Sequence, residues 1–181
     1  MKMLKKLLFT FISLSILLTG CTKKDSESEA LAALYESYYE SISANEIFIS
    51  SSNYYSLSGE IVAVSDGTYR YSIILDNPQI AMYNVVMMAV ENNIQYDNAT
   101  KMMPSIGIVD DQYSLVPFQS NTSRNYVKGL VISGESDTSS IELKLLVEWN
   151  NRSRDKQFRE FWNITLDENG INTNNSQEIS E

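Results

Sequence analysis

The stretch that decides the fold is Ile141-Glu142-Leu143-Lys144-Leu145-Leu146-Val147-Glu148-Trp149. Side chains of a β-strand point alternately to its two faces, so alternation of apolar and charged residues predicts a strand with one inward and one outward face. Such a strand predicts that truncating Leu145 destabilises the fold, whereas truncating Glu142 or Lys144 does not. The apolar members are Ile141, Leu143, Leu145, Val147 and Trp149, and the charged members are Glu142, Lys144 and Glu148.

Strand patterns recur on both sides of this segment. Residues 59–64 and 69–75 flank Ser65-Asp66-Gly67-Thr68, a strong hairpin signal. Residues 81–91 are almost continuously apolar, which predicts a central strand covered on both faces. Shorter strands are expected at 106–109, 114–117, 126–133 and 158–166. Seven or eight short strands separated by turns predict a β-sandwich, with a core that includes Ile73, Val86, Met88, Leu143, Leu145, Val147, Trp149 and Trp162.

One amphipathic helix is predicted before the strands, over residues 28–45. Ser26 and Glu29 have the spacing of a capping box, which marks a helix start. An apolar, tyrosine-rich stripe then repeats at helical spacing. The stripe packs on the sheet of the same domain, which we favour, or offers Tyr35 and Tyr39 to a partner. Its members are Leu31, Leu34, Tyr35, Tyr38, Tyr39 and Ile42.

The N-terminal residues have the pattern of an export signal. Lys2, Lys5 and Lys6 form a positive segment, and residues 7–18 form an apolar run of signal-peptide length. That run is shorter than the about 20 residues needed to cross a bilayer. Cys21, which is the single cysteine of the chain, follows directly after Leu18-Thr19-Gly20. The alternative is an ordinary secreted protein whose cysteine is buried.

Leu18-Thr19-Gly20-Cys21 resembles the lipobox of bacterial lipoproteins. The resemblance implies a signal peptide over residues 1–20, cleavage before Cys21, and a mature N-terminus that carries S-diacylglycerol and N-palmitoyl groups on Cys21. Two acyl chains give stable membrane anchoring. The expected location is therefore the extracellular face of the cell membrane, with residues 21–27 as a lipidated polar tether.

The mature chain is strongly acidic. Eleven of the fourteen basic residues follow Cys21, against twenty-three acids, which leaves a charge of about −12. This charge argues against nucleic acid as a partner. It also predicts that the domain avoids anionic lipid and projects its far loops outward, and that a basic ligand would be steered to it electrostatically. With Cys21 modified, no thiol remains for a disulfide.

A second resemblance covers residues 69–166. Tyr83-Asn84-Val85-Val86 running to Asn92, residues 106–111, Val127-Lys128-Gly129 and residues 141–149 resemble the immunoglobulin-like extracellular lipoproteins of low-GC Gram-positive bacteria. The resemblance implies an Ig-like sandwich on the cell surface, and fold alone does not confer function.

The available side chains argue against an enzyme. The chain has no histidine, which removes the commonest general base and the usual nucleophile and zinc systems. No glycine-rich phosphate loop is present, so we expect no cofactor. Paired carboxylates could still serve a glycan hydrolase. The candidates are scattered through the sequence: Glu60, Glu91, Glu135, Glu148 and Glu160.

Two acidic turns are candidate calcium sites. Asp110-Asp111 offers hard oxygen ligands in a loop, but adjacent acids are common turn formers. Asp167-Glu168-Asn169-Gly170 has its glycine too early for an EF-hand. We therefore expect no metal site, and we regard Asp110 and Asp111 as candidate partner contacts instead.

Three classes of function are compatible with the sequence. The leading hypothesis is a membrane-anchored, non-enzymatic binding or accessory module for an unidentified extracellular protein or glycan. The second is a protective or immunity lipoprotein that intercepts a toxin or phage component, and the third is a carboxylate-based glycan hydrolase. The domain organisation expected for all three is a signal peptide (1–20), a tether (21–27), a helix (28–45), a sandwich (46–166) and a disordered acidic tail (167–181).

Overall fold

The computed structural model describes residues 22–65, 67–92 and 94–174. The chain divides into two compact units, Met1–Leu34 and Tyr35–Glu181, and all of the strands belong to the second unit. Cys21 and residues 1–20, predicted to be a signal peptide, lie outside the described residues. Within the described ranges, no helix combines the length and apolar character that a membrane span requires.

Helix α2 spans Thr22–Ser43. It begins earlier than the capping box predicts, so residues 22–27, expected to be a tether, are helical. Lysine and glutamate are good helix formers, and no glycine or proline interrupts this segment. The helix ends where Lys144 Nζ donates to the backbone carbonyls of Ser43 at 2.6 Å and Asn45 at 3.0 Å. A cation at this position satisfies carbonyls that have no partner within the helix.

The predicted β-sandwich is confirmed. A three-stranded antiparallel sheet has the order β1-β2-β7, with bounds Ser56–Ser65, Thr68–Asp76 and Leu130–Ser136. The predicted hairpin joins β1 to β2, and Gly67 adopts φ +82° in its turn, a conformation that favours glycine.

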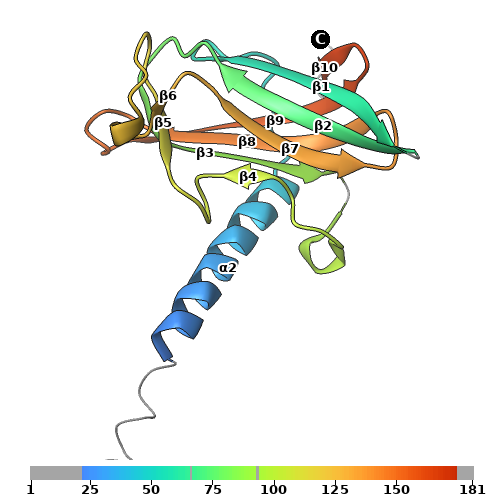
Figure 1. Cartoon of the computed structure of the whole chain (residues 1–181), viewed down its shortest axis with the longest axis horizontal. Helices are drawn as coiled ribbons and strands as arrows, with labels where there is room; N and C mark the ends of the chain where they lie inside the picture. The colour runs from blue at the N-terminus through green and yellow to red at the C-terminus, as the bar shows by residue number, and fades with distance from the viewer. Residues whose placement is uncertain (1–21, 66, 93, 175–181) are drawn as a thin grey trace, which may run out of the picture. The chain divides into compact units, whose positions relative to one another are not determined.

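The second sheet has seven strands in the order β10-β9-β8-β3-β5-β6, with β4 also paired to β3. β3 is central, as predicted. The bounds are β3 Met82–Glu91, β4 Ser105–Ile106, β5 Tyr113–Leu115, β6 Tyr126–Val127, β8 Ile141–Asn150, β9 Gln157–Asp167 and β10 Gly170–Thr173. Figure 1 shows the two sheets stacked, with β1, β2 and β7 over β3, β8 and β9.

Residues 167–173, predicted to belong to a disordered tail, are instead ordered in strands β9 and β10 and the turn between them. β9 and β10 form an antiparallel hairpin in which Gly170 pairs with Asp167 and adopts φ +99°. The polar composition of residues 168–173 reflects a surface hairpin instead of disorder, because both strands use backbone hydrogen bonds. Residues 175–181 lie outside the described ranges.

The main core lies between the two sheets. It combines β2 and β7 residues such as Tyr71 and Ile132 with one face of β3, β8 and β9. Gly134 lies opposite Tyr71 in the ladder, and a side chain at Gly134 would overlap the Tyr71 ring. Of the eight predicted core residues, six lie in this core: Ile73, Leu143, Leu145, Val147, Trp149 and Trp162.

A second core covers the opposite face of the large sheet. Val86, Met88 and Leu146 point to this side and are buried with residues of helix α2. The charged face predicted for residues 141–149 is therefore partly covered: Glu148 is buried and Lys144 half-buried, whereas Glu142 faces water. The helix residues in this core are Tyr35, Tyr39 and Ile42, joined by Val90, Met103 and Ile108.

Candidate functional site

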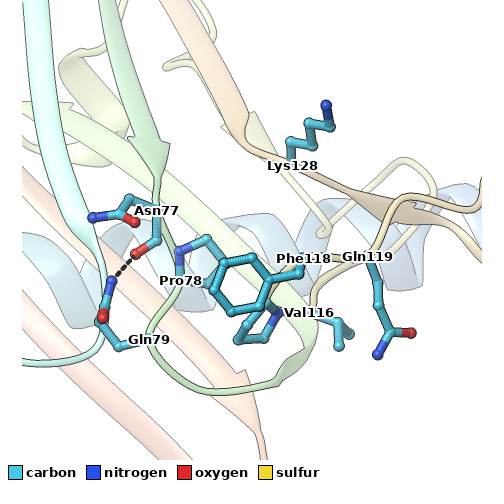
Figure 2. A pocket seen from close by; sticks show the side chains of 8 residues that line it. Asn77, Pro78, Gln79, Val116, Phe118, Gln119 and Lys128 are labelled. Atoms are coloured by element: carbon cyan, nitrogen blue, oxygen red, sulfur yellow. Dashed lines mark hydrogen bonds between the residues drawn. The ribbon is translucent and has the colours of Figure 1, made fainter.

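A hollow of about 480 Å³ opens at one end of the sandwich, between two loops. Figure 2 shows the side chains that line it. The first loop joins β2 to β3, the second follows β5, and one further residue comes from the segment between β6 and β7. The lining residues are Asn77, Pro78, Gln79, Val116, Pro117, Phe118, Gln119 and Lys128.

Local hydrogen bonds fix the first loop. Asn77 adopts φ +49°, which asparagine tolerates better than most residues. Its Nδ2 donates to Ser56 Oγ at 3.2 Å, and Gln79 Nε2 donates to the Asn77 carbonyl at 2.8 Å (Figure 2). The Gln79 N–H also donates to the carbonyl of Tyr54 at 2.7 Å. These hydrogen bonds attach the loop to Tyr54 and Ser56, at the start of β1.

Phe118 is the distinctive residue of the second loop. Its exposed fraction is 109%, the largest among the exposed apolar side chains of the described residues. It also adopts φ +60°, which is uncommon for a large side chain and costs about 1–3 kcal/mol. The Gln119 N–H donates to the Val116 carbonyl at 3.0 Å and closes the turn around Phe118. The fold thus presents an aromatic ring to solvent at an energetic cost.

Phe118 was not a candidate in the sequence. The pattern of Val-Pro-Phe-Gln predicts the end of a strand and the start of a loop. Neither the exposure nor the positive φ of Phe118 leaves a signal in the sequence, because both depend on how β5 ends.

The structure does not support Tyr35 and Tyr39 as partner contacts. Both side chains are buried in the second core. Their hydroxyl groups donate to the backbone carbonyls of Met103 and Ile94, each at 3.1 Å. Burial raises the pKa of both phenols above the usual value. The favoured interpretation of the stripe, packing on the domain's own sheet, is confirmed for these two residues.

Asp110 and Asp111 are both exposed in the loop between β4 and β5. Asp110 Oδ1 accepts a 2.6 Å hydrogen bond from the Gly107 N–H, which makes it a turn former. Asp167 Oδ1 likewise accepts from the Asn169 N–H at 2.7 Å, within the β9–β10 turn. Among the described residues, no three His, Cys, Asp or Glu side chains form a group that could hold a metal ion.

The candidate carboxylates do not converge on one site. Glu60 and Glu135 lie on the outer face of the small sheet, where Glu135 pairs with Arg70 at 3.8 Å. Glu91 pairs with Lys101 at 2.6 Å. Glu148 and Glu160 are on neighbouring strands but lie opposite Arg159 and Val147, so they face opposite sides of the large sheet.

Glu148 belongs to a buried polar cluster on the helix side of β8. The sequence predicts an outward-facing acid, but its exposed fraction is 3%. Tyr38 and Gln157 donate to Oε1 at 2.7 and 2.8 Å, and Arg159 Nε donates to Oε2 at 2.5 Å. Burial, followed by the hydrogen bond to Glu148, raises the pKa of Tyr38 to about 12. Every oxygen of Glu148 is occupied, which is the arrangement of a structural acid.

No protein-family model, curated protein or solved structure matches this chain.

Proposed function

We propose that the protein is a lipid-anchored extracellular protein of the cell membrane that acts as a non-enzymatic binding module. Its binding surface is the loop end of the sandwich, formed by residues 77–80, 116–119 and Lys128. The observation that carries this proposal is Phe118, which is fully exposed in a strained conformation beside a hollow. Strained backbone concentrates at functional sites, and loops on a rigid scaffold carry most binding surfaces.

The anchoring part of the proposal rests on the lipobox at Leu18-Thr19-Gly20-Cys21. Mass spectrometry of the mature N-terminus is expected to find Cys21 acylated. The Cys21→Ser variant is expected to remain unprocessed or to be released into the medium. Cleavage at another position, or an unmodified Cys21, would contradict the anchor.

The binding part is tested with a matched pair of substitutions. Phe118→Ala removes the exposed ring, and Met102→Ala removes another exposed apolar side chain, 70% accessible, from the loop that precedes β4. The acyl-free chain 21–181 with Cys21→Ser is mixed with isolated cell envelopes, and the bound fraction is measured. Phe118→Ala is expected to reduce binding at least tenfold and Met102→Ala to leave it unchanged. Equal binding by the Phe118→Ala and Met102→Ala variants would show that the loop end is not the binding surface.

A further inference from the structure

The loops at this end of the sandwich are basic, although the chain as a whole carries a charge of −9. Residues 76–81, 116–129 and 151–156 contain two acids, Asp76 and Asp155, and five basic residues. All five basic side chains are exposed, and none makes a salt bridge with another described residue. They are Arg124, Lys128, Arg152, Arg154 and Lys156.

Strand pairing brings these loops together. Tyr83, near the start of β3, pairs with Asn150 at the end of β8, while Met82 pairs with Leu115 at the end of β5. The segments 116–119 and 151–156 therefore leave the sheet at the same level, on either side of β3. Strands lie about 4.8 Å apart, so the two segments start roughly 10 Å from each other. Figure 1 shows both at the left-hand end of the sheets.

The loop of residues 151–156, which carries three of the basic residues, has a defined conformation. Asp155 Oδ1 accepts hydrogen bonds from Asn151 Nδ2 at 2.7 Å and Ser153 Oγ at 2.8 Å. Arg154 adopts φ +59° within this turn. The single acid of the loop is thus engaged by its neighbours, and Arg152, Arg154 and Lys156 remain accessible around it.

We propose that this basic end docks on an anionic phospholipid surface, with Phe118 entering the lipid interface and Lys128 beside the headgroups. The proposal rests on the proposed function and names the ligand of the same site. It reverses the prediction from net charge that the loops avoid lipid, because the charge nearest a surface governs the interaction and screening removes more distant charges.

Two observations favour lipid over a protein or glycan. Aromatic side chains prefer the boundary between headgroups and acyl chains, and a ring held away from the protein surface suits that boundary. Unpaired lysine and arginine near the surface attract anionic headgroups. Lys128, which is exposed and lines the hollow beside Phe118, supplies a cation for a phosphate group.

The test measures binding of the acyl-free chain 21–181 with Cys21→Ser to lipid vesicles. This chain retains every described residue. One set of vesicles is phosphatidylcholine alone, and the other contains one third phosphatidylglycerol. Binding is expected only to the second set, and it is expected to weaken as added salt shortens the Debye length.

Substitutions at the site are paired with controls elsewhere. Phe118→Ala and Lys128→Glu are each expected to weaken vesicle binding at least tenfold. Met102→Ala and Arg70→Glu remove comparable groups from other surfaces and are expected to change it less than twofold. Phe118→Trp is expected to retain binding and to show a blue-shifted emission with vesicles. Circular dichroism confirms that each variant is folded.

Several outcomes would overturn the proposal. Equal binding to both vesicle sets, or no binding to either, would exclude anionic lipid as the ligand. Competition by soluble glycerol phosphate without vesicle attachment would assign the site to a free phosphate compound. If envelopes bind through Phe118 while vesicles do not, the binding module stands and the ligand is a protein or glycan. If neither binds, both proposals fail.

Discussion

The phenol hydroxyl of Tyr38 on helix α2 donates a 2.7 Å hydrogen bond to Oε1 of Glu148 on β8, across 110 positions of sequence. The guanidinium of Arg159, 5.9 Å from the Tyr38 ring centre, donates to the other oxygen of Glu148. This contact joins the C-terminal part of the helix to the large sheet through a buried charge. Removing one partner of a buried ion pair destabilises the fold, because the remaining charge is left without compensation.

Glu148→Ala is expected to destabilise the fold by about 1–3 kcal/mol, because Tyr38 and Arg159 lose their acceptor in a desolvated position. Glu148→Gln keeps one acceptor oxygen and is expected to cost less. The control is Glu142→Ala, an exposed acid on the same strand. Urea unfolding measures all three, and a Glu148→Ala variant as stable as Glu142→Ala would show that the cluster contributes nothing.

Leu145→Ala and Leu146→Ala are both expected to cost about 2–5 kcal/mol. Both side chains are fully buried, Leu145 between the sheets and Leu146 beneath helix α2. A strand with only one buried face would instead tolerate Leu146→Ala. Thermal unfolding distinguishes the two cases. If Leu146→Ala left the stability unchanged, the helix would not pack on this face of the sheet.

Lys144→Ala is expected to cost about 1–2 kcal/mol, although the sequence pattern predicts no effect. The Lys144 ammonium donates to two carbonyls at the end of helix α2 and lies 5.5 Å from the Phe48 ring centre. Hydrogen bonds from a charged donor contribute about 1.5–3 kcal/mol, and the site is half-buried. Lys144→Met keeps the aliphatic stem and isolates the contribution of the charge. Unchanged stability in both variants would show that the hydrogen bonds from Lys144 do not stabilise the end of helix α2.

The fold is expected to lose stability as pH rises from about 10 towards 12. Burial raises the pKa of five phenols, and that of Tyr38 reaches about 12. A pKa raised in the folded state gives stability that is complete below the unfolded value and declines above it. Tyrosinate absorbance and circular dichroism followed together check this, and Tyr38→Phe is expected to decline less steeply. Constant unfolding free energy across this range would contradict it. The five residues are Tyr35, Tyr38, Tyr39, Tyr55 and Tyr71.

The sequence by itself determined the β-sandwich and its main core. Alternation in residues 141–149 and the apolar run at residues 81–91 depend on side-chain direction within single strands, which local pattern reveals. The helix was also predicted from local spacing. Its start was placed too late because the capping box at Ser26 and Glu29 is only one of several sites at which a chain of good helix formers can begin.

Only the tertiary structure decided which faces are covered and which residues gather at one end. Tyr35, Tyr39 and Glu148 are buried because helix α2 packs on the large sheet, a contact between segments far apart in sequence. The basic loop end arises from strand pairings that unite three separated loops, whereas net charge, a sum over the whole chain, predicts the opposite ligand. Composition carries no information about position, so a basic surface on an acidic protein becomes visible only once the strands are paired.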